Sequence, residues 1–130
     1  RTALVSSEIK YDIITSQPSH PWLAGSSNLF TKEFFDIVSS RLNSDGIFTQ
    51  WMALFGMDEV SFKTVLKTFY SVFPYGFTME HKMSGDFMLI GSKSPIIFNF
   101  DQMKKRIQDS NIGNKLKAYH VFQPEDLFYK

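Results

Sequence analysis

Residues 17–25, QPSHPWLAG, carry side chains that could bind or protonate a small ligand on a backbone unsuited to helix or strand. Two prolines and a glycine break regular structure here, directly after the apolar run YDIIT. The His20 imidazole could accept a proton near neutral pH. The Gln17 carboxamide has no titratable group and cannot be a general base. The segment is therefore a candidate active-site loop; an ordinary turn holding His20 is the alternative.

Regular elements are predicted on both sides of this loop. The β-branched run at residues 11–15 predicts a buried strand. Apolar spacing predicts a helix over residues 30–42, and NSDG at residues 43–46 is typical of a helix stop. Residues 47–54 are apolar on both faces and predict a second strand. The strongest helical pattern covers residues 57–74, where Asp58 is a natural N-cap and Pro74 ends the helix.

The rest of the chain adds two strands and weaker helices. Strands are predicted at residues 75–81 and 86–93, joined by a short hairpin loop. Helices are predicted at residues 100–108 and 114–122. The order β-α-β-α-β-β-α favours an α/β fold whose sheet is mostly parallel with one antiparallel strand. We expect one domain over residues 1–130. The loop at residues 17–25 then lies beyond a strand's carboxyl end, where open α/β sheets bind ligands.

Composition excludes several classes of function. The 130 residues are 43% hydrophobic, which argues against disorder, and the net charge of +1 gives no general attraction to nucleic acid. The chain has no cysteine, so disulfides, cysteine-ligated zinc and thiol catalysis are excluded. The three histidines have no metal-ligand spacing, so no metal site is predicted. No segment reads as a membrane span or signal peptide, and a cytoplasmic location is the default expectation.

Residues 11–51 resemble the central part of spermidine and spermine synthases. Tyr11-Asp12 opens the strand, Ser19 and Pro21 hold the frame of the loop, and Leu29-Phe30-Thr31-Lys32-Glu33-Phe34 matches the start of the following helix. Gly46 and Gln50-Trp51 match the next strand. The segment PWLAGSSNLF resembles the uncharacterised spermidine synthase-like branch more closely than the well-studied enzymes. The C-terminal segment QPEDLFYK is similar to the last segment of the family's domain.

The resemblance implies a fold and an activity. The fold would be the C-terminal half of a Rossmann-like sheet of the S-adenosylmethionine-dependent methyltransferase type. The activity would be transfer of an aminopropyl group from decarboxylated S-adenosylmethionine to a polyamine, with decarboxylated S-adenosylmethionine or S-adenosylmethionine as co-substrate and no built-in cofactor. Gln17 and His20 occupy the positions of the family's two catalytic acids. The substrate-binding positions implied are Pro18, Ser19, Pro21, Trp22, Gln50 and Trp51.

Two departures from the family pattern limit this expectation. Gln17 and His20 stand where the family has acids. The glycine-rich turn that holds the nucleoside is absent, because no two of the seven glycines are spaced as G-x-G. We expect the chain, which begins with Arg1, to be the C-terminal portion of a larger domain and to be inactive or incomplete alone. A methyltransferase-like protein and a non-catalytic assembly or small-molecule-binding domain are the alternatives, and Trp51 could be a core residue.

The first predicted strand has a consequence for partners. If the sheet lacks its first half, the strand at residues 11–15 has no neighbour on one side, and an unpaired apolar edge invites pairing with another chain. We expect either a homodimer through this edge or a fragment of a longer protein. The default expectation is a cytoplasmic location, and a longer protein could carry a membrane tether outside this chain. No nucleic-acid partner is expected.

Overall fold

The structure, a computed structural model, describes residues 1–18, 23–81 and 85–127. The chain divides into two compact units, Arg1–Ile96 and Ile97–Lys130. No helix among the described residues is long and apolar enough to cross a bilayer. The single domain expected from the sequence stays a prediction.

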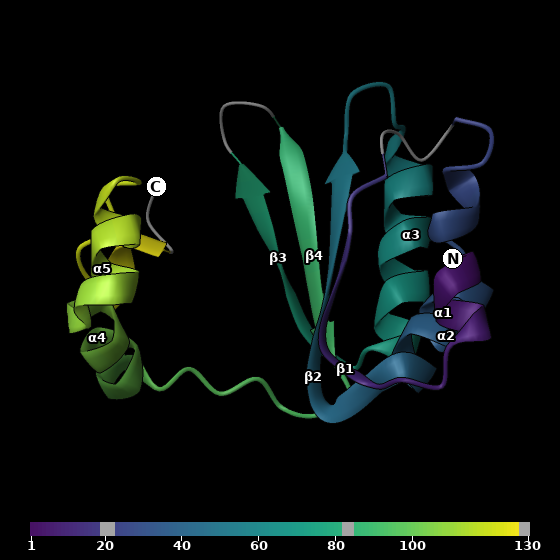
Figure 1. The fold of residues 1–130 in the computed structure, drawn as a ribbon. Coiled ribbons are helices and arrows are strands. Elements are labelled where there is room, and N and C mark those ends of the chain that lie inside the picture. Colours follow the sequence, from purple (N-terminus) through teal and green to yellow (C-terminus); the bar gives the residue numbers. More distant parts are fainter. Residues whose placement is uncertain (19–22, 82–84, 128–130) are drawn as a thin grey trace. The chain divides into compact units, whose positions relative to one another are not determined.

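Four strands form the sheet of the first unit (Figure 1). They are β1 (Tyr11–Ser16), β2 (Leu42–Ala53), β3 (Tyr75–His81) and β4 (Asp86–Ser92), in the spatial order β1-β2-β4-β3. β1 pairs with β2 in parallel, and β4 pairs antiparallel with both β2 and β3. Three strands therefore run one way and β4 runs the other, which confirms the predicted fold class.

Four helical segments accompany these strands: α1 (Thr2–Ser6), the 3-10 turn η1 (Ser27–Leu29), α2 (Lys32–Arg41) and α3 (Glu59–Val72). Side-chain caps fix the starts of the two long helices. Thr31 accepts a hydrogen bond from the Phe34 N–H, and Asp58 accepts one from the Ser61 N–H. Each cap satisfies a backbone donor that has no partner inside its helix. The N-cap predicted at Asp58 is confirmed.

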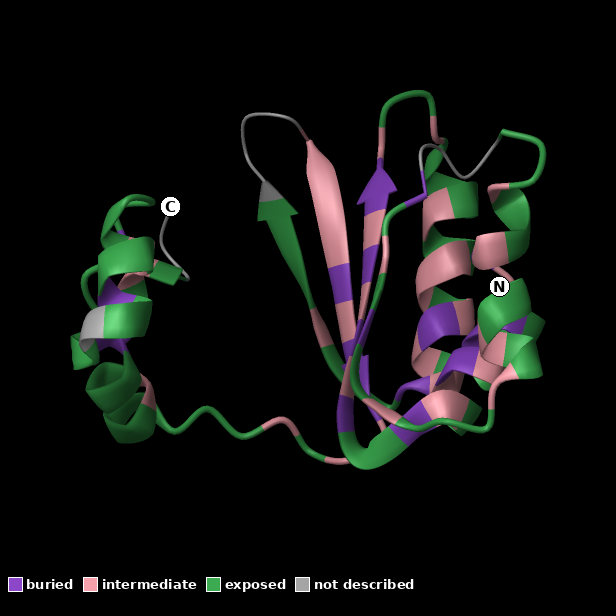
Figure 2. Ribbon diagram, in the orientation of Figure 1, coloured by how far each residue is buried: buried purple, intermediate pink, exposed green. Residues whose placement is uncertain are grey.

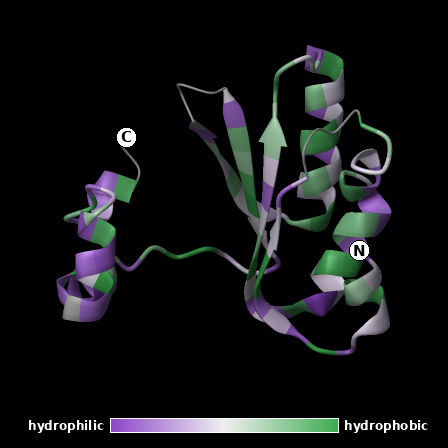
Figure 3. Cartoon of the chain, turned by 45° about the horizontal axis from the view of Figure 1, so that its top comes forward, coloured by the Kyte–Doolittle hydropathy of each residue, from purple (hydrophilic) through white to green (hydrophobic). Residues whose placement is uncertain are grey.

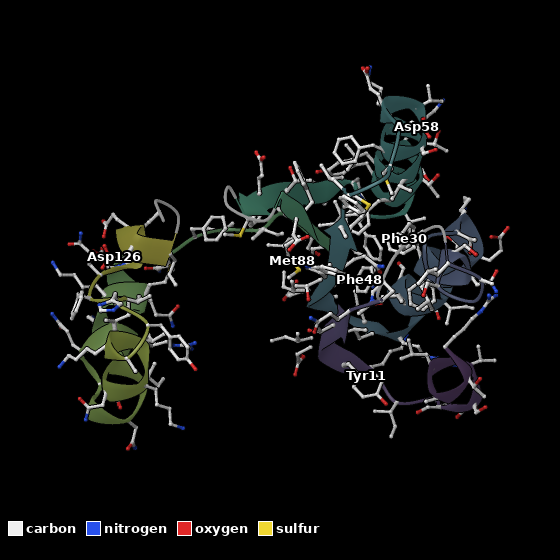
Figure 4. The ribbon with its side chains drawn as sticks, turned by 90° about the horizontal axis from the view of Figure 1, so that it is seen from above. Tyr11, Phe30, Phe48, Asp58, Met88 and Asp126 are labelled. Carbon is white, nitrogen blue, oxygen red and sulfur yellow. The ribbon has the colours of Figure 1, made fainter. Side chains whose placement is uncertain are left out.

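Phenylalanines build the core between the sheet and the helices. Phe48 of β2 packs against four rings, with centroid separations of 6.2, 6.1, 6.0 and 5.3 Å to Phe34, Phe35, Phe69 and Phe73. Edge-to-face and offset arrangements at these distances are favourable for aromatic pairs. The cluster fastens α2 and α3 to one face of the sheet, as Figures 1 and 4 show.

The other face of the sheet has no helix from the described part of residues 1–96 (Figure 1). Side chains alternate along a strand, so the ladder register assigns each residue to a face. Figure 4 places Phe48 on the helical side and Met88 on the opposite side. We call this second surface the open face, and its large side chains are Ile13, Ile47, Trp51, Tyr75, Phe77, Met79, Met88 and Ile90. Figure 2 shows β3 largely exposed, and Figure 3 shows hydrophobic stretches on β2 and β4.

The prediction that Asn43–Gly46 form a turn after the helix is wrong, because these residues belong to β2. α2 ends when Leu42 turns directly to an extended conformation, without a left-handed glycine. The carbonyls of this irregular stretch accept hydrogen bonds from side chains at the end of β4 and just after it. Ser92 Oγ donates to the Gly46 oxygen at 3.0 Å, Lys93 Nζ to Leu42 at 3.0 Å and Ser94 Oγ to Ser44 at 2.9 Å. These long-range bonds outweigh the local turn signal.

The second unit is a small helical segment. It contains α4 (Phe100–Gln108), α5 (Ser110–Lys117) and the 3-10 turn η2 (Pro124–Leu127). The limits predicted for α4 are confirmed, whereas α5 begins four residues before the predicted helix. Asn99 caps α4 through the Gln102 N–H, and Asp126 accepts from the backbone N–H groups of Phe122 and Gln123. The last residues of the tail motif lie outside the described residues.

Candidate functional site

The carboxyl ends of β1 and β2 lie side by side, and the candidate loop leaves from this point. In the parallel ladder Ser16 is the partner of Gln50. Gln17 follows β1 and is exposed, while Pro18 is buried. The loop therefore begins next to the strand that carries Gln50. The roles of Gln17 and Gln50 as site residues stay predictions.

Gln50 is the most unusual side chain in this region. Its exposed fraction is 0%, and it lies on the helical side of the sheet between Phe48 and Met52. Neither Nε2 nor Oε1 has a hydrogen-bond partner in the described part of the chain. A buried amide without partners costs about 1 to 3 kcal/mol, so proteins retain few such groups. Gln50 thus offers one donor and one acceptor that the described fold leaves unused.

Trp51 does not share a crevice with Gln50. Adjacent residues of a strand point to opposite faces, so Trp51 lies on the open face, half-buried, opposite Met88 of β4. Trp51 is therefore not part of the phenylalanine core either. The structure therefore puts these two predicted substrate-binding residues on opposite faces of the sheet, and their roles stay predictions.

Four of the predicted site residues, Ser19, His20, Pro21 and Trp22, lie outside the described residues. Their roles stay predictions. The described portion of the candidate site accordingly consists of Gln17, Pro18 and Gln50.

A cavity that the sequence did not predict lies between η1 and the start of α3. Its volume is about 380 Å³. Its walls come from segments that follow β1 and β2 in the sequence. The cavity therefore lies at the carboxyl ends of these strands, where the loop also begins. Local sequence signals identified Asp58 only as a helix cap and gave no sign of a cavity beside it. The described lining residues are Ser27, Phe30, Gly56, Met57, Asp58, Val60, Ser61, Thr64 and Val65.

Asp58 determines the charge of this cavity. Its Oδ2 accepts from the Ser61 hydroxyl at 2.7 Å and its Oδ1 from the Ser61 N–H at 2.9 Å. The hydroxyl bond first and the backbone bond second lower the pKa of Asp58 below its ordinary value of 3.8. The group is therefore ionised at neutral pH. A fixed negative charge at the helix start disfavours a phosphate there and suits a cation with an apolar stem.

Metal chemistry finds no support in the described residues, where no three histidine or acidic side chains gather closely enough to hold an ion. The described residues of the site offer amide and carboxylate groups for binding. Within the described portion, Gln17 and Gln50 cannot take up a proton.

The four-stranded sheet and its helices form an α/β fold that is similar to the Rossmann fold of methyltransferase-like proteins. Human methyltransferase-like protein 13, solved in complex with SAH, matches with a TM-score of 0.65 and 18% identity over 89% of this chain and 54% of that chain. A spermidine synthase in complex with the transition-state analogue AdoDATO matches with a TM-score of 0.62 and 21% identity, covering 80% and 38%. Spermidine synthase from Thermotoga maritima matches with a TM-score of 0.58 and 21% identity, covering 80% and 37%.

At these identities the solved structures establish the fold, and this chain spans about half or less of their length. The family is established by the sequence. The spermine/spermidine synthase domain matches residues 2–90, so the chain belongs to that family. A search of curated proteins found no match.

Proposed function

We propose that this chain forms the acceptor-side wall of a spermidine synthase-like site, in which Gln50 contacts the ligand beyond the carboxyl ends of β1 and β2. The buried, unpartnered carboxamide of Gln50 is the observation that carries the proposal. Its oxygen can accept from an amine or ammonium, and its nitrogen can donate to a nucleoside or sulfonium-bearing ligand. A ligand that supplies these bonds would remove the cost of burying the amide.

The chemistry proposed for the complete site is aminopropyl transfer. A polyamine nitrogen attacks the carbon beside the sulfonium of decarboxylated S-adenosylmethionine. The C–N bond forms as the C–S bond breaks, methylthioadenosine leaves with the electron pair of that bond, and the nitrogen releases one proton. The Asp58 carboxylate supports the choice of a polyamine, because its cavity offers one negative charge beside apolar walls.

Proton removal is the step that the described residues do not support. Gln17 is neutral at every relevant pH, and so is Gln50. His20, which stands at the position of the family's second acid, lies outside the described residues. We therefore propose that the 130-residue chain contributes binding contacts and does not turn over substrate alone.

Calorimetric titration tests this function on the protein expressed from its complete reading frame. The ligands are decarboxylated S-adenosylmethionine, S-adenosylmethionine and methylthioadenosine. The expected result is binding of the decarboxylated form at least 10-fold more tightly than S-adenosylmethionine. The reverse preference would replace the proposal with a methyltransferase-like function. Binding of none of the three would favour a non-catalytic assembly domain.

A further inference from the structure

The cavity between η1 and the start of α3 has hydrogen-bonded segments on both sides. In η1 the Phe30 N–H donates to the Ser27 oxygen at 3.0 Å, and both residues line the cavity. On the other side, a turn closed by the Met57 N–H and the Leu54 oxygen at 2.9 Å leads into α3, and Gly56 adopts a left-handed φ of 77° there. The volume of about 380 Å³ is typical of small-molecule sites. The cavity is therefore formed before any ligand binds.

The polar groups of this cavity offer mainly hydrogen-bond acceptors. The Ser61 hydroxyl donates to Asp58 Oδ2 at 2.7 Å. The Thr64 hydroxyl donates to the Val60 oxygen at 2.7 Å. Because a hydroxyl carries one proton, Ser61 and Thr64 have only acceptor lone pairs left for a ligand. No lysine, arginine or histidine is among the lining residues that the structure describes, so the cavity suits a ligand that donates several hydrogen bonds.

One negative charge and apolar walls restrict the ligand further. Asp58 carries the single charge among the described lining residues, and it offsets the partial positive charge of the α3 N-terminus that would otherwise repel a cation. Phe30, Met57 and Val65 contribute apolar surface. A second ammonium group inside the cavity would lose its hydration without gaining a charged partner, which is costly. The matching group is thus one ammonium attached to a hydrocarbon chain.

We propose that this cavity is a binding site for one primary ammonium group with an apolar carbon chain. The ammonium donates to the Asp58 carboxylate and to the hydroxyl oxygens of Ser61 and Thr64. The chain lies against Phe30 and Val65. A polyamine can bind with one terminal ammonium inside and its other ammonium groups in water. As the subsite that selects an amine acceptor the cavity rests on the proposed function, whereas its affinity for amines does not depend on Gln50.

Other classes of ligand fit the cavity less well. A quaternary ammonium has no N–H to donate to the hydroxyl oxygens. An alcohol has no charge to match the Asp58 carboxylate, and an anion is repelled by it. The proposal therefore predicts selectivity for a protonated primary amine over its alcohol and its trimethylated analogue.

Methyl NMR of the protein expressed from its complete reading frame tests the site. The methionine methyl groups are labelled with ¹³C, and the Met57 signal is assigned by its absence in Met57→Leu. We expect hexylamine to shift this signal and to bind about 10-fold more tightly than 1-hexanol or trimethylhexylammonium. Each methylene removed from the chain should weaken binding about 2- to 4-fold. A Met57 signal that hexylamine does not move, or equal affinities for hexylamine and 1-hexanol, would overturn the proposal.

A diamine tests whether the cavity accepts a single charge. 1,6-Diaminohexane should bind no more tightly than hexylamine, because its second ammonium finds no partner in the cavity. Clearly tighter binding of the diamine would contradict the single-charge site.

Two carboxylates at the start of α3 provide matched variants. Asp58→Asn, which keeps a capping oxygen, should weaken hexylamine binding about 10-fold and leave 1-hexanol binding unchanged. Glu59 is paired with Lys63 and is not among the lining residues, so Glu59→Gln should change hexylamine binding less than about 2-fold. Equal losses in the two variants would show a general electrostatic attraction and overturn the site.

The same titrations separate this inference from the proposed function. Hexylamine binding at Met57 in a protein that binds no decarboxylated S-adenosylmethionine would support the amine site and refute the proposed function. Binding of decarboxylated S-adenosylmethionine with no response of Met57 to amines would support the proposed function and overturn the amine site.

Discussion

Ser16, the last residue of β1, is the ladder partner of Gln50 in β2. This pairing brings the backbone at the start of the loop, just before Gln17, next to the part of β2 that carries Gln50. Because β1 and β2 are parallel, their carboxyl ends lie at the same edge of the sheet. Open α/β sheets bind ligands at this edge. One backbone register thus connects the loop to the amide that the described fold leaves unpaired.

Replacing Gln50 should stabilise the protein. Gln50→Met keeps nearly the same side-chain length and removes two unpartnered polar atoms, so we expect the free energy of unfolding to rise by about 1 to 3 kcal/mol. Urea denaturation measures it. Gln102→Met, the same change at an exposed position of α4, is the control and should leave stability unchanged. A Gln50→Met protein less stable than the parent would mean that the amide has a partner in the native protein.

The phenylalanine core predicts a large contrast between two identical substitutions. Phe48 is fully buried among four rings, and Phe48→Ala should lower the free energy of unfolding by about 3 to 5 kcal/mol. Phe55 is 86% exposed, and Phe55→Ala should change it by less than about 0.5 kcal/mol. Denaturant unfolding of the two variants measures the difference. Similar effects would contradict the placement of the core.

Gly91 is needed for the packing of α3 on the sheet. A methyl group at this position would lie 2.7 Å from Phe69 Cζ and 2.7 Å from Phe73 Cβ. Because both rings are buried and tightly packed, Gly91→Ala should destabilise the protein by about 1 to 3 kcal/mol. Gly25→Ala is a useful comparison, since its left-handed φ of 91° causes strain but no atom lies within 4 Å. Equal thermal shifts would show that packing is not the cause at Gly91.

Asp58 should give the protein a pH-dependent element of stability. Its folded pKa lies below the ordinary value of 3.8 because Ser61 donates two hydrogen bonds to the carboxylate. The stabilisation is therefore complete above the unfolded pKa and is lost as the pH falls through the folded pKa. Melting temperatures of the parent and of Asp58→Asn, which keeps a capping oxygen, should differ at pH 7 and converge below pH 3.8. A constant difference across this range would refute the assignment.

Local sequence patterns predict much of the secondary structure of residues 1–96. Pro74 and the apolar spacing defined the end of α3, and the predicted limits of β3, residues 75–81, agree with the structure. Asn43–Gly46 was misread because its conformation depends on side chains about fifty positions away, such as Ser92 and Ser94. Tertiary contacts of this kind leave no local pattern.

For the candidate site as well, local sequence patterns predicted some features, while others depend on tertiary structure. The loop could be located from its prolines and from the strand before it. The opposite orientations of Gln50 and Trp51 follow from the pleat of β2, which a resemblance between sequences does not convey. The cavity beside Asp58 depends on how η1 packs near α3, a tertiary feature that no local pattern reports.

The side-chain amide resonance of Gln50 tests the central proposal most directly. In ¹⁵N-labelled protein from the complete reading frame, this signal can be assigned by its absence in Gln50→Met. We predict that saturating decarboxylated S-adenosylmethionine together with a polyamine shifts the Gln50 signal, while the side-chain amide of Gln102 stays in place. Ligand binding that leaves the Gln50 resonance unmoved would contradict the account.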